Sequence, residues 1–250
     1  MQTVQRTSDR AEIRRRLNFD RVWSIYALAD LDAGLFDLCD WWICGEGLAL
    51  VFKGISIIPI FVSGNREEVR QLLAALPAER GYLNLRDLDA QDSYVYQDPH
   101  RMHRMVVDRF QANPGMAVLL GLDHLDEIQA LYATGDGGGV AFGAFQLETG
   151  FFRGVYHDNQ LVAVAGVHVV SHAEGVAGVG NVFTREDHRG RGLAQVVTSA
   201  VVSALIEAGI ETIGLNVEHT NALAIAAYRK LGFRTAFEYW EGTAVKKPIG

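Results

Sequence analysis

The sequence of 250 residues has little of what marks several large classes of protein. Its two cysteines, Cys39 and Cys44, are too few for a disulfide framework, and their Cys-x4-Cys spacing has no second pair of ligands to form a metal site. No stretch reaches the roughly 18 consecutive apolar residues of a membrane span, and the first residues lack the apolar core of a secretion signal. We therefore expect a protein of a reducing compartment, the cytoplasm, with no bound metal and no membrane partner.

Basic residues are also scarce relative to acidic ones. The chain has 23 Lys and Arg against 30 Asp and Glu, a formal net charge of −7. Nucleic acids and anionic membranes attract proteins through summed positive charge, so we expect this chain to bind neither. Any anionic ligand has to be held by a local site.

The residues that are present fit an ordinary folded protein. The chain is 49% hydrophobic and 21% charged, and its length suits one large domain or two small ones. Glycine is unevenly placed, however: 8 of the 26 lie in residues 1–125 and 18 lie in residues 126–250. The second half therefore needs glycine in a way that the first half does not.

In the first half, the apolar pattern alternates between helical and strand periodicity. It predicts helices over 8–17 and 22–31, a hairpin over 48–52 and 55–62, a helix over 65–76, and strands over 82–85, 93–96 and 101–110. Asn65 is the expected cap of the third helix, and Pro59 predicts an edge strand or a bulge. The breaker Asn113-Pro114-Gly115 predicts a boundary between an N-terminal domain over 1–115 and a C-terminal domain over 116–250.

In the second half, the best-defined element is a helix over 193–208, whose apolar residues follow the i, i+3, i+4, i+7 rule. Around it the pattern predicts strands over 117–120, 151–156, 161–170, 176–184, 212–217 and 233–240, and helices over 123–132 and 221–231. The order β-α-β-β-β-α-β-α-β predicts an α/β fold with a mixed sheet covered by helices.

The segment between strand 176–184 and helix 193–208 predicts a phosphate site. Amides at a helix start have no partner within the helix, and the helix dipole adds about half a positive charge, so an anion is stabilised there. Gly190 and Gly192 allow the backbone to approach an anion at positive φ, while Arg189 and Arg191 supply charge. This arrangement is suited to a diphosphate.

Two blocks of this half resemble the GNAT acyltransferase family. Arg189-Gly-Arg-Gly192-Leu-Ala194 is similar to the family signature Q/R-x-x-G-x-G/A for the coenzyme A pyrophosphate. Leu215-Asn-Val217 and the stretch from Asn221 to Phe233 resemble its second block. The resemblance covers about residues 117–241 and implies a GNAT-like fold. In the first half, the strand-turn-helix stretch that contains Ser63-Gly-Asn-Arg66 resembles a degenerate copy of the same fold. The two halves together are similar to the tandem arrangement of glycine N-acyltransferase-like proteins.

The resemblance implies acetyl-CoA, or another acyl-CoA, as co-substrate and no metal. The residues that it implies for cofactor binding are Val182, Thr184, Arg189, Gly190, Arg191, Gly192, Leu193, Ala194 and Asn221. Tyr228 lies two turns after Asn221 on the same helix face, and the family places such a phenol where it protonates the departing thiolate. An ordinary pKa near 10 keeps a phenol protonated at neutral pH.

The residue that accepts a proton from the substrate is not defined by the sequence. Many relatives carry a glutamate inside the strand that matches 176–184, but this chain has no acid there. Glu218 and His219, at the end of strand 212–217, are the catalytic candidates, while His168, His172 and ordered water remain alternatives.

We therefore expect an acyl-CoA-dependent N-acyltransferase, most simply an N-acetyltransferase, in which a primary amine attacks the thioester directly. The acceptor is expected to be a small molecule or amino-acid-like amine. The alternative is a non-catalytic module that binds acyl-CoA or recruits a partner. The sequence leaves acceptor, acyl length and oligomeric state, monomer or homodimer, open.

Overall fold

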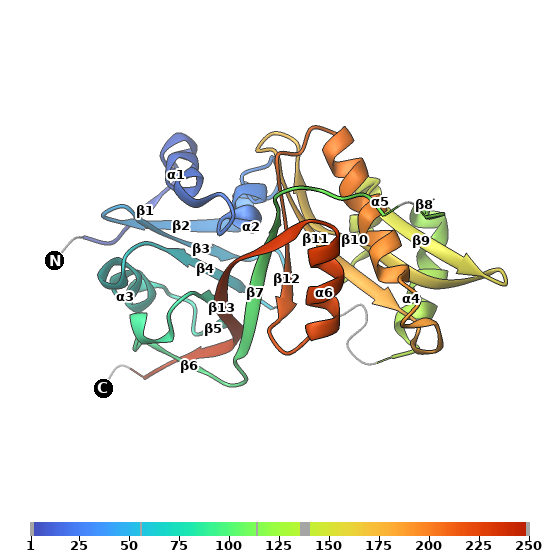
Figure 1. Cartoon of the computed structure of the whole chain (residues 1–250). Coiled ribbons are helices and arrows are strands. Elements are labelled where there is room, and N and C mark those ends of the chain that lie inside the picture. Colours follow the sequence, from blue (N-terminus) through green and yellow to red (C-terminus); the bar gives the residue numbers. More distant parts are fainter. Residues whose placement is uncertain (1–2, 56, 114, 136–140, 249–250) are drawn as a thin grey trace. The chain divides into compact units, whose positions relative to one another are not determined.

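The computed structural model describes residues 3–55, 57–113, 115–135 and 141–248, so Pro114 of the predicted breaker lies outside the described residues. The chain divides into two compact units. Unit 1 holds residues 1–104 and 237–250, and unit 2 holds residues 105–236. Strands β7 (His100–Val107) and β13 (Phe233–Lys246) run across the two boundaries (Figure 1). The domain boundary that the sequence predicts after residue 115 separates segments that are expected to fold independently. That boundary stays a prediction.

The sheet of unit 1 has the strand order β1-β2-β3-β4-β5-β13, and β6 also pairs with β13. Its strands are β1 (Gln5–Thr7), β2 (Cys39–Cys44), β3 (Gly47–Phe52), β4 (Pro59–Ser63), β5 (Arg80–Leu85) and β6 (Tyr94–Tyr96). Neighbours from β1 to β4 are antiparallel, whereas β4 and β5 are parallel because a helix connects them. The predicted hairpin and later strands are confirmed, while β1 and β2 were not predicted.

Helices cover the sheet of unit 1. They are α1 (Arg10–Leu17), α2 (Ile25–Ala29) and α3 (Arg66–Ala75), with short 3-10 turns η1 (Asn18–Asp20), η2 (Phe36–Leu38) and η3 (Leu88–Ala90). Asn65 caps α3, as predicted. Pro59 begins β4, which lies between β3 and β5, so the predicted edge position is wrong. Proline is tolerated because it is the first residue of the strand.

The sheet of unit 2 has the order β7-β12-β11-β10-β9-β8. Its further strands are β8 (Val118–Leu120), β9 (Phe152–His157), β10 (Gln160–Ser171), β11 (Val176–Thr184) and β12 (Thr212–Glu218). From β8 to β11 neighbours are antiparallel, and β11 is parallel to β12. The predicted mixed α/β sheet is thus confirmed.

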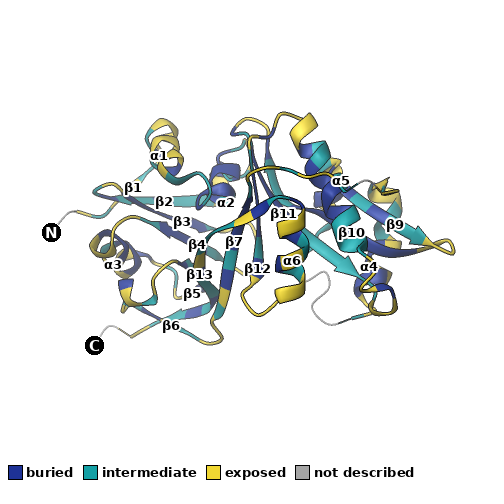
Figure 2. Ribbon diagram, viewed as in Figure 1, coloured by how far each residue is buried: buried dark blue, intermediate teal, exposed yellow. Residues whose placement is uncertain are grey.

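Alternate residues of β10 enter two separate cores, one on each face of the sheet. Ala163 and Ala165 pack beneath α5 (Leu193–Glu207) and α6 (Ala222–Lys230), whereas Val164 packs beneath α4 (Leu125–Tyr132) and η5 (Ala144–Thr149). Two more 3-10 turns are η4 (Leu122–His124) and η6 (Glu186–His188). Figure 2 shows α5 buried or half-buried along most of its length and exposed only at its C-terminal end.

Among the described residues, no helix has both the length and the apolar character that crossing a membrane requires. Cys39 and Cys44, at the two ends of β2, form no disulfide.

Candidate functional site

The pairing of β11 with β12 ends halfway along β11. Residues 176–179 pair with residues 212–215, and the register goes no further in this fully described stretch. Residues 180–184 therefore have a strand partner only on the β10 side. Backbone groups on the β12 side of this half-strand have no strand partner there, which makes this edge suited to a ligand with hydrogen-bonding groups.

A β-bulge lies in the same half of β11. Gly180 pairs with Gly166 and Phe183 pairs with Val164, so that Asn181 and Val182 together oppose one residue of β10. Asn181 has a φ of 55°, which is unusual for a residue other than glycine. A bulge of this kind turns backbone groups away from the regular ladder.

Thr184, at the end of β11, has a buried hydroxyl oxygen without a hydrogen-bond partner in the described part of the chain. A buried hydroxyl without a partner is costly, so such a group is suited to meeting a polar atom of a ligand. Val182 and Thr184, the two predicted contacts of the cofactor's pantetheine arm, thus lie in the unpaired half of the strand.

Two glycines shape the loop before α5. Gly190 and Gly192 have φ of 77° and 79°, which L side chains rarely adopt, and Gly192 is the N-cap of α5 with no side-chain cap. A Cβ added to either residue would meet nothing within 4 Å. The space in front of this backbone is therefore open, as the predicted phosphate site requires.

The amides of residues 190–194 are available to bind an anion. Arg189 donates its N–H to Glu186 O, and the N–H groups of Gln195 and Val196 both bond Gly192 O. In this described segment the amides between them have no backbone acceptor, as expected for a helix start. With the helix dipole they form a candidate anion site that includes the predicted residues Leu193 and Ala194.

The two predicted arginines are held beside this loop. Arg189 Nε donates to Thr184 O at 3.2 Å, and Arg191 Nη2 donates to Asp187 O at 3.2 Å. Each guanidinium is exposed and tied to the loop's own backbone, so its charge stays next to the open amides.

An ion-pair network that the sequence reasoning missed anchors the loop to the β9–β10 turn. Arg185 bonds Asp187 at 2.7 Å and Gln160 Oε1 at 2.7 Å, and His188 Nδ1 lies 2.7 Å from Asp187 Oδ1. Hydrogen bonds from Arg185 and His188 lower the pKa of Asp187 to about 2, so this carboxylate is ionised at neutral pH. The neighbouring residues Arg185-Glu-Asp-His188 contain no pattern that predicts the network, because Gln160 is distant in sequence.

Helix α6 carries the two other predicted residues. Asn221 is its N-cap, and its side-chain oxygen accepts the Ala224 N–H at 3.1 Å. Tyr228 is buried, 8% exposed, and its ring packs on Phe233 with centroids 5.9 Å apart. Burial raises the pKa of Tyr228 to about 12, so the phenol holds its proton throughout the neutral range.

The parallel arrangement of β11 and β12 brings most of the predicted site to one edge of the sheet. Residues 182–194 follow or end β11, while Glu218, His219 and Asn221 follow or end β12 (Figure 1). Glu218 and His219 are exposed. His172 follows β10 next to the start of β11, at the opposite edge, so it is not part of this site.

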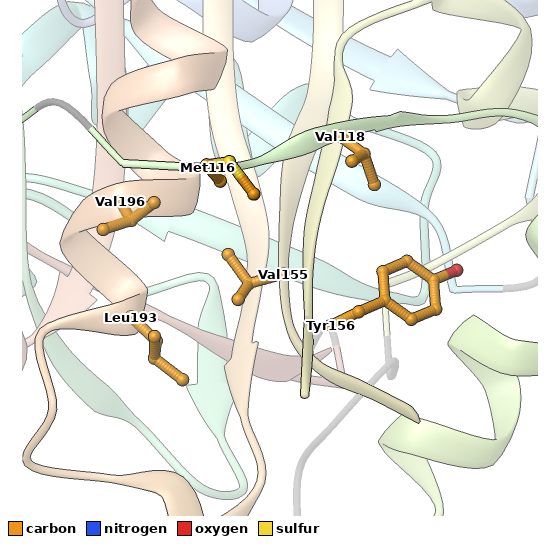
Figure 3. A pocket seen from close by; sticks show the side chains of 6 residues that line it. All are labelled: Met116, Val118, Val155, Tyr156, Leu193 and Val196. Atoms are coloured by element: carbon orange, nitrogen blue, oxygen red, sulfur yellow. The ribbon is translucent and has the colours of Figure 1, made fainter. Parts of the chain in front are cut away.

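An apolar cavity of about 310 Å³ lies beside the first turn of α5. Figure 3 shows the side chains that line it, which come from α5, from β9 and from the segment around β8. They are Met116, Val118, Val155, Tyr156, Leu193 and Val196. The Tyr156 hydroxyl bonds Glu127 at 2.6 Å, and the other lining side chains offer no donor for phosphate. This cavity is therefore distinct from the anion site, although Leu193 belongs to both.

Comparison with known proteins identifies relatives of this chain. Residues 123–233 match the sequence model of the Acetyltransferase (GNAT) family. A mycothiol acetyltransferase from Corynebacterium aurimucosum is 38% identical over 80 residues, which are 30% of this chain and 26% of that protein. The similarity thus spans about a quarter of the length of that relative.

Solved structures extend the likeness to the whole chain at the level of the fold. An acetyltransferase of the GNAT family from Novosphingobium aromaticivorans has a TM-score of 0.58 at 23% identity, covering 74% of this chain and 84% of its own. A tandem GNAT protein from the clavulanic acid biosynthesis pathway has a TM-score of 0.57 at 14% identity, covering 100% of both chains.

Proposed function

Because residues 123–233 form a GNAT acetyltransferase domain, we propose that this protein is an acyl-CoA-dependent N-acetyltransferase acting on a primary amine. The acceptor is a small molecule or an amino-acid-like amine. The observation that carries the proposal is the uncapped start of α5, where Gly190 and Gly192 keep the backbone amides open. A helix start that binds no anion would not need two glycines at positive φ with open space in front of them.

The co-substrate would lie along the second half of β11. Backbone groups of Val182 and Thr184 would bind the pantetheine arm, and the amides of residues 190–194 would bind the pyrophosphate, with Arg189 and Arg191 adding charge. The partnerless Thr184 hydroxyl and the unpaired side of β11 support this placement. Asn221 would contact the same arm through its side-chain nitrogen, since its oxygen caps α6.

Tyr228 would supply the proton that the departing thiolate takes up. Its raised pKa of about 12 supports this role, because a phenol that stays protonated can donate at neutral pH. The backbone N–H groups turned by the bulge at Asn181 and Val182 would stabilise negative charge on the thioester oxygen. Glu218 and His219, exposed at the end of β12, remain predictions as proton acceptors.

Unit 1 repeats the strand order of unit 2. At the helix start and the strand end that correspond to the candidate site of unit 2, however, its own side chains bind the backbone groups. Strands β2, β3 and β4 are antiparallel, and α3 leads to the parallel strand β5. At the start of α3, Asn65 accepts two amides, and the Glu68 carboxylate accepts the N–H groups of Glu46 and Asn65. Trp23 donates its indole N–H to Val62 O at the end of β4. We propose that unit 1 is a degenerate copy that binds no acyl-CoA.

Isothermal titration calorimetry with coenzyme A tests the proposed anion site. Gly192→Glu places a carboxylate at the open amides and is expected to weaken binding at least about 100-fold, since like charge and bulk both oppose the pyrophosphate. Gly209→Glu is the matched control, because Gly209 follows the other end of α5, also at positive φ with open space. Equal affinity in the two variants would refute the site.

Thiol release from acetyl-CoA over a panel of primary amines tests the reaction itself. Release that depends on the amine is the expected result. Tight coenzyme A binding without release by any amine would instead favour a non-catalytic acyl-CoA-binding module.

A further inference from the structure

The imidazole of His168 lies where a side chain of β11 would otherwise be. A Cβ built on Gly180 would be 2.3 Å from His168 Nε2 and 2.4 Å from two of its ring carbons, so the ring fills the space next to the glycine backbone. This glycine directly precedes the bulge at Asn181. The strand that lacks a carboxylate at residues 175–181 is thus provided with a basic group by its neighbour.

A second bulge, in β10, presents His168 to this position. Val167 pairs with Val179 and Val169 pairs with Gly178, so His168 is an extra residue with no opposite partner in the ladder. Bulges are known to re-aim side chains next to active sites. Two bulges on facing strands, one at His168 and one at Asn181, therefore meet at one place in the sheet.

A polar network holds the imidazole there. The side chain of Asn181 hydrogen-bonds His168 and donates from Nδ2 to Gln146 Oε1 at 3.0 Å. Gln146, on η5 and 4% exposed, donates from Nε2 to His168 O at 3.2 Å. The Tyr132 hydroxyl donates to Asn181 O at 2.8 Å. Residues from α4, η5, β10 and β11 thus set the position of one ring.

We propose that His168 is the group that accepts the proton of the attacking amine, in place of a carboxylate on β11. The proposal rests on the proposed acetyltransferase function and deepens it. The side chains of Asn181 and Gln146 act as positioning groups, because they hold the ring and the bulge in place.

The amine nitrogen forms a bond to the thioester carbonyl carbon, and one N–H proton passes to the neutral imidazole of His168. The carbon–sulfur bond breaks, its electron pair leaves on sulfur, and the thiolate takes the proton of Tyr228. His168 then loses its proton to water and Tyr228 regains one, so that the products are an amide and a free thiol.

The protonation state of His168 agrees with this role. Burial lowers its pKa to about 4, against a smaller opposing effect of the Asn181 hydrogen bond, so the ring is neutral above that pH. A neutral imidazole can accept a proton, and His168 as a whole residue is partly exposed.

Steady-state kinetics of His168→Gln with acetyl-CoA and the best amine of the panel tests the proposal. We expect kcat to fall about 10²- to 10⁴-fold, which is the usual contribution of a general base. Coenzyme A affinity by calorimetry and the melting temperature should stay near those of the wild type. The matched control is His172→Gln, since His172 is exposed after the same strand at the opposite edge, and its kcat should be unchanged.

Two results would overturn the proposal. One is a kcat in His168→Gln above half of the wild-type value. The other is a fall in kcat accompanied by an equal fall in coenzyme A affinity, which would indicate a structural effect. If the wild type released no thiol with any amine, the proposed function would fail. The position of His168 would then be tested by the NMR signal of its ring. This signal is assigned as the one that disappears in His168→Gln. Saturation with acetyl-CoA should shift this signal and leave that of His172 in place, and an unmoved His168 signal would reject the proposal.

Discussion

The Glu68 carboxylate accepts the backbone N–H of Asn65 at 2.8 Å, so helix α3 carries its own anion at the start where helix α5 has none. Glu68 is 7% exposed and also accepts the Glu46 N–H at 2.9 Å. A second anion at this helix start would meet a buried negative charge and amides already bonded.

We therefore predict that the protein binds one coenzyme A per chain. Calorimetric titration should give a stoichiometry near one for the wild type, with the whole binding signal lost in Gly192→Glu. A residual site of similar affinity in that variant would show that unit 1 also binds the ligand.

The capping box of α3 should contribute to stability. Asn65→Ala removes the acceptor of the Glu67 and Glu68 amides and is expected to lower the free energy of unfolding by about 1 kcal/mol. Urea denaturation measures the change. Asn65→Asp retains the acceptor and should lose much less, so an equal loss in both variants would contradict a capping role.

Asn221 allows a cap and a ligand contact to be separated by choice of substitution. Asn221→Ala removes the acceptor of the Ala224 N–H and should cost about 1 kcal/mol of stability, whereas Asn221→Ser keeps an N-cap oxygen. Both variants lack the side-chain amide, so both should bind coenzyme A more weakly. Restored affinity in Asn221→Ser would reduce this residue to a helix cap.

Tyr228→Phe should lower kcat about 10²-fold or more with little change in KM for acetyl-CoA, because only the proton to the leaving thiolate is lost.

Since burial raises the pKa of Tyr228 from 10 to about 12, the wild-type phenol stays protonated through pH 10. We therefore expect no loss of kcat from its ionisation below that pH. Stability linked to this group is complete below pH 10 and is lost as the pH rises towards 12.

Tyr156→Phe is the control for this variant. It removes a hydroxyl that bonds Glu127 at 2.6 Å, in the same unit but beside the apolar cavity. Its kcat should equal that of the wild type. Full activity in Tyr228→Phe would remove the proposed acid while leaving the acetyltransferase proposal intact.

Gly180→Ala tests the contact with His168 directly. The added methyl group would lie 2.3 Å from the imidazole, so the ring has to move and we expect a loss of about 1–3 kcal/mol in stability. In a His168→Ala background the same substitution should cost much less, because the obstacle is gone. Thermal denaturation of the four proteins measures the coupling. Gly121→Ala, which would meet nothing within 4 Å, should be near neutral.

Much of the fold is encoded in local patterns that the sequence displays. The apolar i, i+3, i+4, i+7 repeat of α5, the apolar runs of β10 and β11 and the cap at Asn65 each depend on residues close together in the chain, and each was predictable. The short strands β1 and β2 were missed, since β1 has three residues and β2 contains an aspartate and two tryptophans in place of a β-branched run.

The candidate anion site could be predicted from local sequence alone, because an uncapped helix start needs only glycines, arginines and the following apolar periodicity, all within residues 189–208. The positions of His168, His172 and Glu68 depend instead on tertiary contacts. His168 reaches Gly180, and His172 is carried to the other edge, through a strand register that bulges shift by single residues. Glu68 closes the start of α3 by accepting an amide from the preceding hairpin as well as its own N-cap. Such contacts join residues that are far apart in the sequence and that strand pairing and folding bring together. No local pattern specifies them.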